Sequence, residues 1–370
     1  MTREEQNSKK NEALEQFQLD GAVADCSLYG NGHINDTYLV RCTLERGKEK
    51  KYILQRMNKE IFKKPVELME NISGVTSYLR KKIQESGGDV ERETMEIIAT
   101  REGKTFYTDS IGENWRCYTF IEDATSFDEV KKPEDFYESA VAFGHFQYML
   151  ADYPAETLHE TIAGFHDTAA RFQRFLEVVA EDKCGRVKET SEEIAFVKAH
   201  EQDMYYLGNL LKEKKIPLRV THNDTKLNNI MIDNKTGKGI CVIDLDTVMP
   251  GLAVNDFGDS IRFGANTGAE DEVDLNKISL DVDLYNIYRK GFMEGCAGSL
   301  TPAEIALLPM GAKIMTLECG MRFLTDYLEG DVYFKIHREH HNLDRCRTQF
   351  KLVADIEKKW DVISSLDAIR

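Results

Sequence analysis

The stretch that decides the fold runs from Thr221 to Asp246 and reads T-H-N-D-T-K-L-N-N-I-M-I-D-N-K-T-G-K-G-I-C-V-I-D-L-D. It contains two short apolar runs, 230–232 and 239–243, separated by turn-forming residues. This pattern predicts a β-hairpin. With Thr236-Gly237 at the centre of the turn, the expected partners are Asp233 with Ile240, Met231 with Val242, and Asn229 with Asp244.

Polar residues stand at the open end of this hairpin. In the expected register, Asn229 and Asp244 lie roughly 5 Å apart. Amide and carboxylate oxygens suit Mg²⁺, which binds one or two protein ligands together with phosphates and water. We therefore predict that Asn229 and Asp244 bind a metal ion.

The loop before the hairpin carries three further candidates. Asp224 can take the proton of a hydroxyl that attacks a γ-phosphate, so we predict it as the catalytic base. His222 is expected to brace the loop by hydrogen bonding to its backbone. Lys226 either contacts the γ-phosphate or is a solvated lysine. A surface hairpin with polar ends would explain any one of these residues, but not the set at this spacing.

Length and charge narrow the class of protein. A chain of 370 residues exceeds the usual size of one hydrophobic core, so two lobes are expected. With 48 Lys and Arg against 64 Asp and Glu, the net charge is −16, which disfavours nucleic acid as a partner. The acidity either attracts a cationic substrate or, more commonly, reflects a well-dispersed surface.

The sequence also bears on localisation. The first ten residues, M-T-R-E-E-Q-N-S-K-K, are charged where a secretory signal is apolar, and no apolar stretch is long enough to span a membrane. The eight cysteines show no C-x-x-C spacing, and Cys117 and Cys241 fall in predicted buried strands. We expect a cytoplasmic protein with reduced cysteines and no membrane partner.

The pattern of residues changes along the chain and predicts an α+β protein with lobes at 1–122 and 123–370. After a helix at Asn11–Leu19, the first lobe is rich in predicted strands. One helix, Pro65–Ile83, interrupts them and ends near Gly87-Gly88. The expected strands are Gly21–Tyr29, Thr37–Thr43, Lys51–Met57, Met95–Thr100, Lys104–Asp109 and Trp115–Ile121.

The second lobe reads as mostly helical apart from the hairpin. A hinge is expected at Tyr118–Asp123, where Phe120 and Glu122 are candidates to contact a nucleotide. The expected helices are Phe136–Leu150, Phe165–Val179, Glu192–Leu211, Leu284–Phe292, Pro302–Tyr327 and Asn342–Ile363.

A glycine-rich segment, Y-G-N-G-H-I-N-D-T-Y at 29–38, joins the first two predicted strands. Its glycines let backbone N–H groups approach a phosphate closely, although an ordinary Asn-Gly hairpin turn is the alternative. With the downstream motif present, Gly30, Gly32 and Asn35 are predicted to bind nucleotide.

The third predicted strand reads Y-I-L-Q-R-M and lacks the lysine of a protein kinase. Either Arg56 or Gln55 takes its place, because a slip of one residue exchanges the faces of the strand. Arg56 is the nucleotide candidate. Glu67 and Glu70 are possible partners for it on the following helix.

Taken together, these residues resemble the aminoglycoside phosphotransferase and choline kinase superfamily. Within it, several segments from about Asp20 to Leu352 are similar to the N-acetylhexosamine 1-kinase family. They include Y-I-L-Q-R-M-N, R-V-T-H-N-D-T-K-L-N-N-I, I-D-L-D-T-V-M-P-G, D-F-G-D-S-I-R-F-G and E-C-G-M-R-F-L-T-D-Y-L-E-G-D-V-Y-F.

The resemblance implies a bilobal protein-kinase-like fold, with a small antiparallel-sheet lobe and a larger, mostly helical lobe. It also implies ATP- and Mg²⁺-dependent phosphorylation of the anomeric (C1) hydroxyl of N-acetylglucosamine or N-acetylgalactosamine. Asp246 would then reach a second ion or a water, and Asp256 would hold the catalytic loop through backbone hydrogen bonds. The sugar-binding positions implied are His33, Phe263, Arg322 and Tyr333.

Three alternatives stay open at this stage. The acceptor could be another hexose, an amino alcohol or an aminoglycoside. The chain could be a catalytically silent binding protein, which would have no chemical need for Asp224, Asn229 and Asp244 together. A formylglycine-type sulfatase would need Cys or Ser followed by x-Pro-x-Arg, and this sequence has no such segment.

Overall fold

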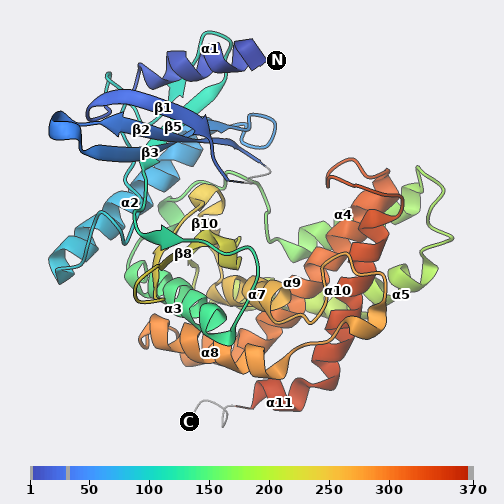
Figure 1. The fold of residues 1–370 in the computed structure, drawn as a ribbon. Coiled ribbons are helices and arrows are strands. Elements are labelled where there is room, and N and C mark those ends of the chain that lie inside the picture. The colour runs from blue at the N-terminus through green and yellow to red at the C-terminus, as the bar shows by residue number, and fades with distance from the viewer. Residues whose placement is uncertain (1–2, 31–33, 366–370) are drawn as a thin grey trace. The chain divides into compact units, whose positions relative to one another are not determined.

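The computed structural model describes residues 3–30 and 34–365, which fold as two compact units (Figure 1). The first unit comprises Met1–Thr125 together with Met231–Val248. The second comprises Ser126–Ile230 and Met249–Arg370. These units differ from the predicted lobes because the hairpin segment groups with the N-terminal part of the chain. The domain boundary at 122/123 stays a prediction.

An antiparallel sheet in the order β1-β2-β3-β5-β4 forms the centre of the first unit. Its strands are β1 (Ala22–Leu28), β2 (Asp36–Thr43), β3 (Glu49–Met57), β4 (Tyr107–Thr108) and β5 (Asn114–Thr119). Side chains alternate between the faces of a strand. The alternate residues on one face pack with the end of helix α1 (Arg3–Leu14) into a core of Ala13, Leu14, Phe17, Tyr38, Val40, Cys42, Tyr52, Leu54, Trp115 and Cys117.

Helix α2 (Pro65–Ser86) begins with proline in its first turn and ends at Gly87, whose left-handed φ of 77° favours glycine. Asn71 in this helix is buried, and its amide donates to the carbonyl of Val248 at 3.0 Å. The helix therefore anchors the segment that follows the hairpin.

The predicted hairpin is present as β8 (Ile230–Asp233) and β9 (Gly239–Val242), with β6 (Ala124–Thr125) beside β8. The predicted register is wrong at its closed end, because the Asp233 N–H donates to the Lys238 carbonyl at 2.8 Å and not toward Ile240. Gly237, at φ 70°, donates to the Asp233 carbonyl at 2.9 Å and forms a bulge. The 5 Å spacing inferred for Asn229 and Asp244 therefore loses its basis.

The second unit is helical apart from a two-stranded sheet of β7 (Arg219–Thr221) and β10 (Met249–Gly251). Its helices are α3 (Pro133–Met149), α4 (Thr168–Glu181), α5 (Ser191–Ala199), α6 (Glu201–Lys212), α7 (Ala253–Gly264), α8 (Val282–Cys296), α9 (Pro302–Glu329), α10 (His341–Lys358) and α11 (Trp360–Ser364). Helix α9 packs against α4, α7 and α10 and supplies much of the core. Short 3₁₀ turns complete the two units at Glu45–Gly47, Ala155–Thr157, Leu227–Asn229, Leu245–Thr247 and Leu275–Lys277.

Helices α7 and α9 approach unusually closely where two glycines meet. A Cβ atom on Gly258 would lie 2.2 Å from the carbonyl oxygen of Gly311, and one on Gly311 would lie 2.1 Å from the carbonyl oxygen of Val254. No side chain fits at either position. This contact fixes the spacing of two helices that both carry candidate site residues.

Several predicted elements differ from the structure. The lead-in helix covers 3–14 instead of 11–19, the strand at 95–100 is reduced to isolated bridges, and only 107–108 of 104–109 is strand. The single helices predicted at 192–211 and 342–363 are each two helices, divided at His200 and Lys359. Helix α7 was not predicted at all; its polar residues, among them Asp256, Asp259 and Arg262, are buried together with its apolar ones.

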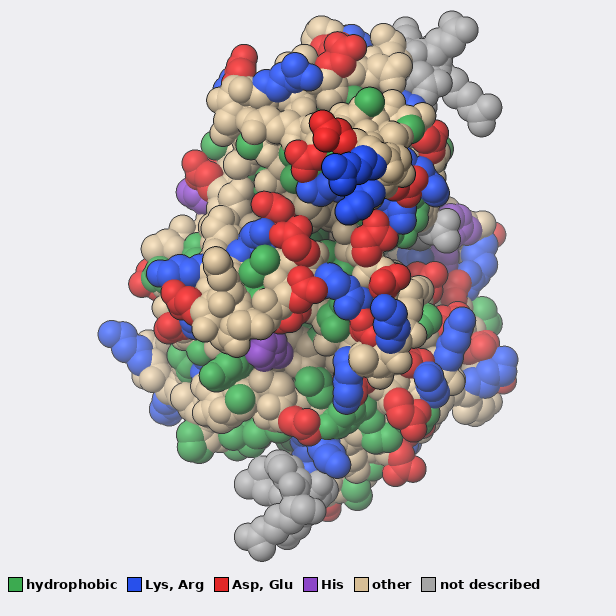
Figure 2. Space-filling view, turned by 60° about the vertical axis from the view of Figure 1, so that its left-hand side comes forward, with side chains coloured by type: hydrophobic (Ala, Val, Ile, Leu, Met, Phe, Trp, Pro, Cys, Tyr) green, Lys and Arg blue, Asp and Glu red, His purple; other side chains and the backbone are tan. Residues whose placement is uncertain are grey.

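Surface and cysteine properties follow the composition. Figure 2 shows acidic and basic side chains interspersed over one face of the molecule.

The eight cysteines are free thiols, with Cys117 and Cys241 buried in β5 and β9 as predicted. Across the described residues, no helix combines the length and apolar character needed to cross a membrane.

Candidate active site

In the second unit, Asp256 of α7 holds the backbone of the loop that follows β7 and begins at His222. The carboxylate of Asp256 accepts hydrogen bonds from the backbone N–H groups of His222 (2.9 Å) and Asn223 (2.8 Å). Gln147 donates to the same carboxylate at 2.8 Å. This is the contact expected of Asp256, and it explains how Asn223 is kept in a left-handed conformation, with φ 64°.

His222 is fully buried, with its ring against Phe143 and Phe146 at centroid distances of 5.4 and 6.1 Å. Its Nδ1 accepts a hydrogen bond from the Asp224 N–H at 3.3 Å. The ring thus supports the backbone of the loop, as expected from the sequence.

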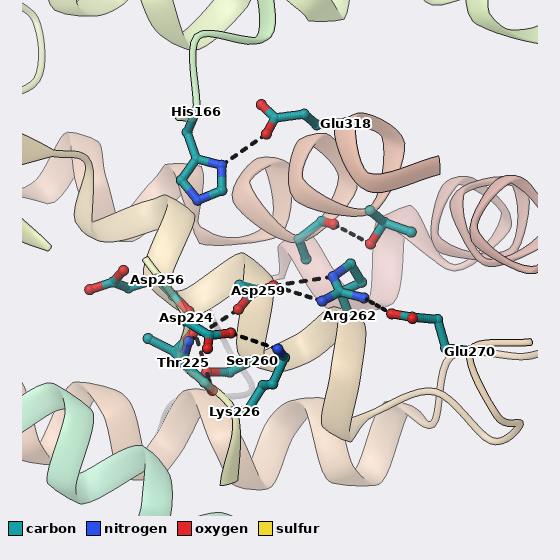
Figure 3. A network of polar contacts seen from close by, with 12 residues as sticks. His166, Asp224, Thr225, Lys226, Asp256, Asp259, Ser260, Arg262, Glu270 and Glu318 are labelled. Carbon is teal, nitrogen blue, oxygen red and sulfur yellow. Dashed lines mark hydrogen bonds and ion pairs between the residues drawn. The ribbon is translucent and has the colours of Figure 1, made fainter. Parts of the chain in front are cut away.

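The carboxylate of Asp224 lies at the centre of this loop and is 30% exposed, so a small molecule can reach it (Figure 3). Oδ1 pairs with the ammonium of Lys226 at 2.8 Å, and the amide of Asn229 donates to Oδ2 at 3.2 Å and to the Asp224 carbonyl at 2.8 Å. Burial alone would lower the pKa of Lys226, but the charges of Asp224 and Asp259 raise it. Lys226 is therefore a charged partner of Asp224 and not simply a solvated lysine.

Asp259 is a further member of the site, one turn beyond Asp256 on α7. Its Oδ2 accepts the Thr225 N–H at 3.1 Å, while Arg262 donates to Oδ1 at 3.0 and 3.2 Å (Figure 3). Burial would raise the pKa of Asp259, but the charges of Arg262 and Lys226 lower it below its ordinary value. The ionised carboxylate helps to hold the loop next to Asp224.

In the first unit, the two acidic residues after β9 differ in their surroundings. Asp244 adopts a left-handed conformation, with φ 57° and ψ 61°, which a non-glycine residue holds only when its surroundings fix it. Asp246 is buried, and both its oxygens have partners: Oδ1 pairs with Arg116, and Oδ2 accepts from the Asn35 amide at 2.7 Å.

Arg116 on β5 is the buried cation that sequence reasoning missed. It donates to Oε1 of Gln55 at 3.0 and 2.7 Å as well as to Asp246. Burial alone would lower its pKa, but the charge of Asp246 raises it, so the guanidinium is charged. Nearby Tyr118, two residues along the same strand, has its pKa raised by burial.

Gln55 and Arg56, the two candidates for the place of the kinase lysine, lie on opposite faces of strand β3. Gln55 pairs with Arg116 across the strands and contacts it, whereas Arg56 lies on the opposite face. Arg56 donates to Asp36 at 2.9 Å and to Glu113 at 3.1 Å. This placement argues against Arg56 as the counterpart of the kinase lysine.

One of the two expected helix partners of Arg56 has a different partner. Glu67 instead pairs with Lys64 at 3.0 Å.

The other nucleotide candidates are placed unevenly. Gly30 has φ 73°, as a turn glycine would, whereas Gly32 lies outside the described residues. Asn35 is buried, and its Oδ1 accepts the Asn58 N–H at 3.0 Å. Phe120 stacks edge-on with Tyr29 at 5.8 Å, and Glu122 pairs with Lys51 at 3.1 Å.

Of the predicted sugar-binding residues, Arg322 and Tyr333 lie in one neighbourhood. The Arg322 guanidinium lies over the rings of Phe165 (5.6 Å) and Phe334 (5.5 Å), and Tyr333 meets Phe334 edge-on at 4.8 Å. Phe263 is half-buried near the end of α7. His33 lies outside the described residues.

A separate group on the second unit, His200, Asp203 and Glu357, has the spacing of metal ligands. The Lys313 ammonium already lies 2.8 Å from Asp203 and 2.9 Å from Glu357. Because this lysine supplies the positive charge that the carboxylates need, we do not assign the group as a metal site.

The sheet unit and the helical unit together define a protein-kinase-like α+β fold, with an H-x-D-x(4)-N loop in its helical part. Residues 25–280 match the model of the phosphotransferase enzyme family, and the chain belongs to that family.

Solved structures agree with this fold over nearly the whole chain. A microcompartment-associated aminopropanol kinase is 16% identical with a TM-score of 0.63, covering 97% of this chain and 98% of its own. An amicoumacin kinase, solved with AMP-PNP and Ca²⁺, is 14% identical with a TM-score of 0.60, covering 97% and 94%. An ethanolamine kinase from Plasmodium vivax is 15% identical with a TM-score of 0.53, covering 88% and 82%.

Proposed function

We propose that this protein is an ATP- and Mg²⁺-dependent kinase that phosphorylates the C1 hydroxyl of N-acetylglucosamine or N-acetylgalactosamine. The observation that carries the phosphotransfer part is the braced loop around Asp224, in which His222, Asp256 and Asp259 all hold backbone N–H groups near one accessible carboxylate. The choice of acceptor rests on the sequence resemblance to N-acetylhexosamine 1-kinases.

Asp224 is the proposed base. Its carboxylate would accept the proton of the C1 hydroxyl as that oxygen attacks the γ-phosphate. An anomeric hydroxyl is more acidic than an ordinary alcohol, which lowers the demand on the base. Lys226, paired with Asp224, is placed to balance charge on the same side of the loop.

Asn229 and Asp244 are the proposed Mg²⁺ ligands. The Asn229 amide nitrogen is committed to Asp224, so its carbonyl oxygen is the atom that suits a hard cation. Asp244 offers a carboxylate held in a strained backbone conformation, as functional residues often are. A bound Mg²⁺ would neutralise charge on the ATP phosphates.

Asp246 fits the metal role less well than predicted. Each of its oxygens already has a partner, so a metal ion bound there would share an oxygen with Arg116 or Asn35. We propose that Arg116 orients Asp246 and supplies the buried positive charge that a lysine supplies in protein kinases.

The test is transfer of phosphate to a panel of acceptors. Purified protein with ATP and Mg²⁺ should release ADP with either acetamido sugar, and much more slowly with glucose, galactose, choline or ethanolamine. Rapid turnover with the amino alcohols alone would support kinase activity but show that the acceptor is an amino alcohol. The similarity to an aminopropanol kinase and an ethanolamine kinase suggests this alternative. No turnover with any acceptor would favour a silent binding protein.

A further inference from the structure

In the second unit, His166 and Glu318 form a pair that the proposed phosphotransfer does not use (Figure 3). Nδ1 of His166 lies 2.8 Å from one oxygen of Glu318, and the hydroxyl of Thr168 donates to the other oxygen. Burial would raise the pKa of Glu318, but His166 and Arg171 lower it to about 2. The carboxylate is therefore ionised, and Nδ1 of His166 carries a proton.

The other ring nitrogen of His166 is the unusual atom. Nε2 is buried and has no hydrogen-bond partner anywhere in the described part of the chain, and the whole side chain is only 10% exposed. A buried polar atom without a partner costs free energy, so native proteins rarely leave one unless a ligand or water uses it.

The ring of His166 faces the loop that carries Asp224 (Figure 3). In Figure 3 its ring stands between Glu318 and the group that contains Asp224 and Asp259. The charges that lower the pKa of Asp259 against the effect of burial include that of His166, after those of Arg262 and Lys226. A molecule held at Nε2 would therefore be near the proposed base.

Two guanidinium groups, those of Arg171 and Arg322, lie near this pair. Arg171 lies 3.7 Å from Glu318 and donates to the Phe165 carbonyl at 2.9 Å, while Arg322 lies over the ring of Phe165. Burial and the charge of Arg322 both lower the pKa of Arg171, so the two guanidinium groups repel each other. Glu318 offsets this repulsion most, and Asp167 adds a smaller negative contribution. Electron-rich oxygens would relieve this repulsion, and an ammonium group would add to it.

A hydroxyl group matches Nε2 in either protonation state. It donates to the lone pair of the neutral ring and accepts from the imidazolium. An ammonium group can only donate, and it cannot pair with the charged ring.

We propose that His166, oriented by Glu318 and flanked by Arg171 and Arg322, binds a hydroxyl of the acceptor and selects uncharged, oxygen-rich acceptors over ammonium-bearing ones. This proposal rests on the proposed function, whose acceptor site it describes. It adds a specificity residue that lies in none of the sequence motifs.

The test compares two sugars that differ at one substituent. N-acetylglucosamine carries an acetamide at C2, and glucosamine carries an ammonium group at the same carbon. The wild-type enzyme should show a kcat/KM at least roughly tenfold higher for the acetamido sugar.

His166→Ala should raise the KM for N-acetylglucosamine by roughly tenfold to a hundredfold with kcat less affected, and the preference over glucosamine should narrow. His166→Gln, which keeps a polar group at this position, should restore part of the affinity. Arg322→Gln should also narrow the preference, and it changes a residue that is not fully buried. The matched control is His200→Gln, since His200 forms a similar pair with Glu357 (3.1 Å) elsewhere in the unit.

Several outcomes would overturn the proposal. Equal kcat/KM values of the wild type for both sugars would do so. An unchanged KM in His166→Ala and Arg322→Gln, with thermal melting showing that both variants are folded, would do so as well. Neither result would contradict the proposed kinase activity. If no acceptor is turned over, the proposed function fails. Calorimetric titration of N-acetylglucosamine then decides: binding that His166→Ala abolishes supports the acceptor site, and absent binding overturns it.

Discussion

Arg116 and Asp246 form a buried ion pair in the first unit, with side chains only 4% and 6% exposed. Removing one partner of such a pair leaves an uncompensated buried charge, which costs about 3–5 kcal/mol. We predict that Arg116→Met and Asp246→Leu each destabilise the protein by amounts in this range. The double variant should lose much less than the sum, as measured by urea unfolding. Additive losses would show that the pair is not coupled.

Asp224→Ala should lower kcat by roughly 10²- to 10⁴-fold and leave nucleotide affinity nearly unchanged, because only proton transfer from the acceptor is lost. Steady-state kinetics and calorimetric titration of nucleotide measure the two effects separately. Asp283→Ala, at an exposed aspartate in the first turn of α8, is the matched control. A near-wild-type rate in Asp224→Ala would remove Asp224 from the role of base.

Asp244→Ala should weaken the binding of ATP in the presence of Mg²⁺ and leave the weak metal-free binding of ATP unchanged, because the lost carboxylate acts through the metal. Titration of nucleotide with Mg²⁺ and then with EDTA measures this difference. A variant whose binding responds to Mg²⁺ as the wild type does would contradict the assignment of Asp244 as a ligand.

Gly258→Ala should destabilise the protein by about 1–3 kcal/mol or more, because the added methyl group would lie 2.2 Å from the Gly311 carbonyl and force α7 away from α9. Gly208→Ala is the control, since Gly208 in α6 has open space around its Cβ position. There the substitution should stabilise the protein by about 0.4–1 kcal/mol. Thermal and urea unfolding report both changes, and equal effects at the two positions would contradict the close helix contact.

Stability should depend on pH through Glu318. Its pKa in the folded protein is about 2, below its ordinary value of 4.5, so the unfolded chain binds the proton more tightly. The stabilisation is therefore fully present above pH 4.5 and is lost as the pH falls toward 2. We expect the difference in unfolding free energy between the wild type and Glu318→Gln to shrink over this interval. A difference that stays constant would mean that the pKa of Glu318 is not lowered.

The sequence predicted the α+β class, the main strands, the hairpin and the long helices because each has a clear period or a clear end signal. Helix α7 was not predicted, although polar residues recur along it at helical spacing, because Gly258 in its interior weakens the helix signal. The register of the hairpin was predicted wrongly because the turn begins at Asp233. The side chain of Asp233 accepts hydrogen bonds from the backbone N–H groups of Lys235 and Thr236, and the sequence alone does not show these contacts.

In the candidate site, too, residues that belong to a motif could be predicted from the sequence and residues outside a motif could not. Asp224 and Asp256 belong to spaced motifs, so the sequence singles them out; in the structure the Asp224 N–H donates to His222 and Asp256 accepts from the His222 N–H. Arg116 carries no motif, and only the strand register of β3 against β5 places it beside Gln55. His166 was equally hidden, because its partner Glu318 lies 152 residues away in the sequence.

The most direct test of the central claim is to identify the product formed from ATP, Mg²⁺ and N-acetylglucosamine labelled with ¹³C at C1. The account predicts a new ³¹P signal coupled to the labelled carbon, formed by the wild type and nearly absent with Asp224→Ala. A phosphate attached at another position, or no sugar phosphate from either acetamido sugar, would contradict the assignment of this chain as an N-acetylhexosamine 1-kinase.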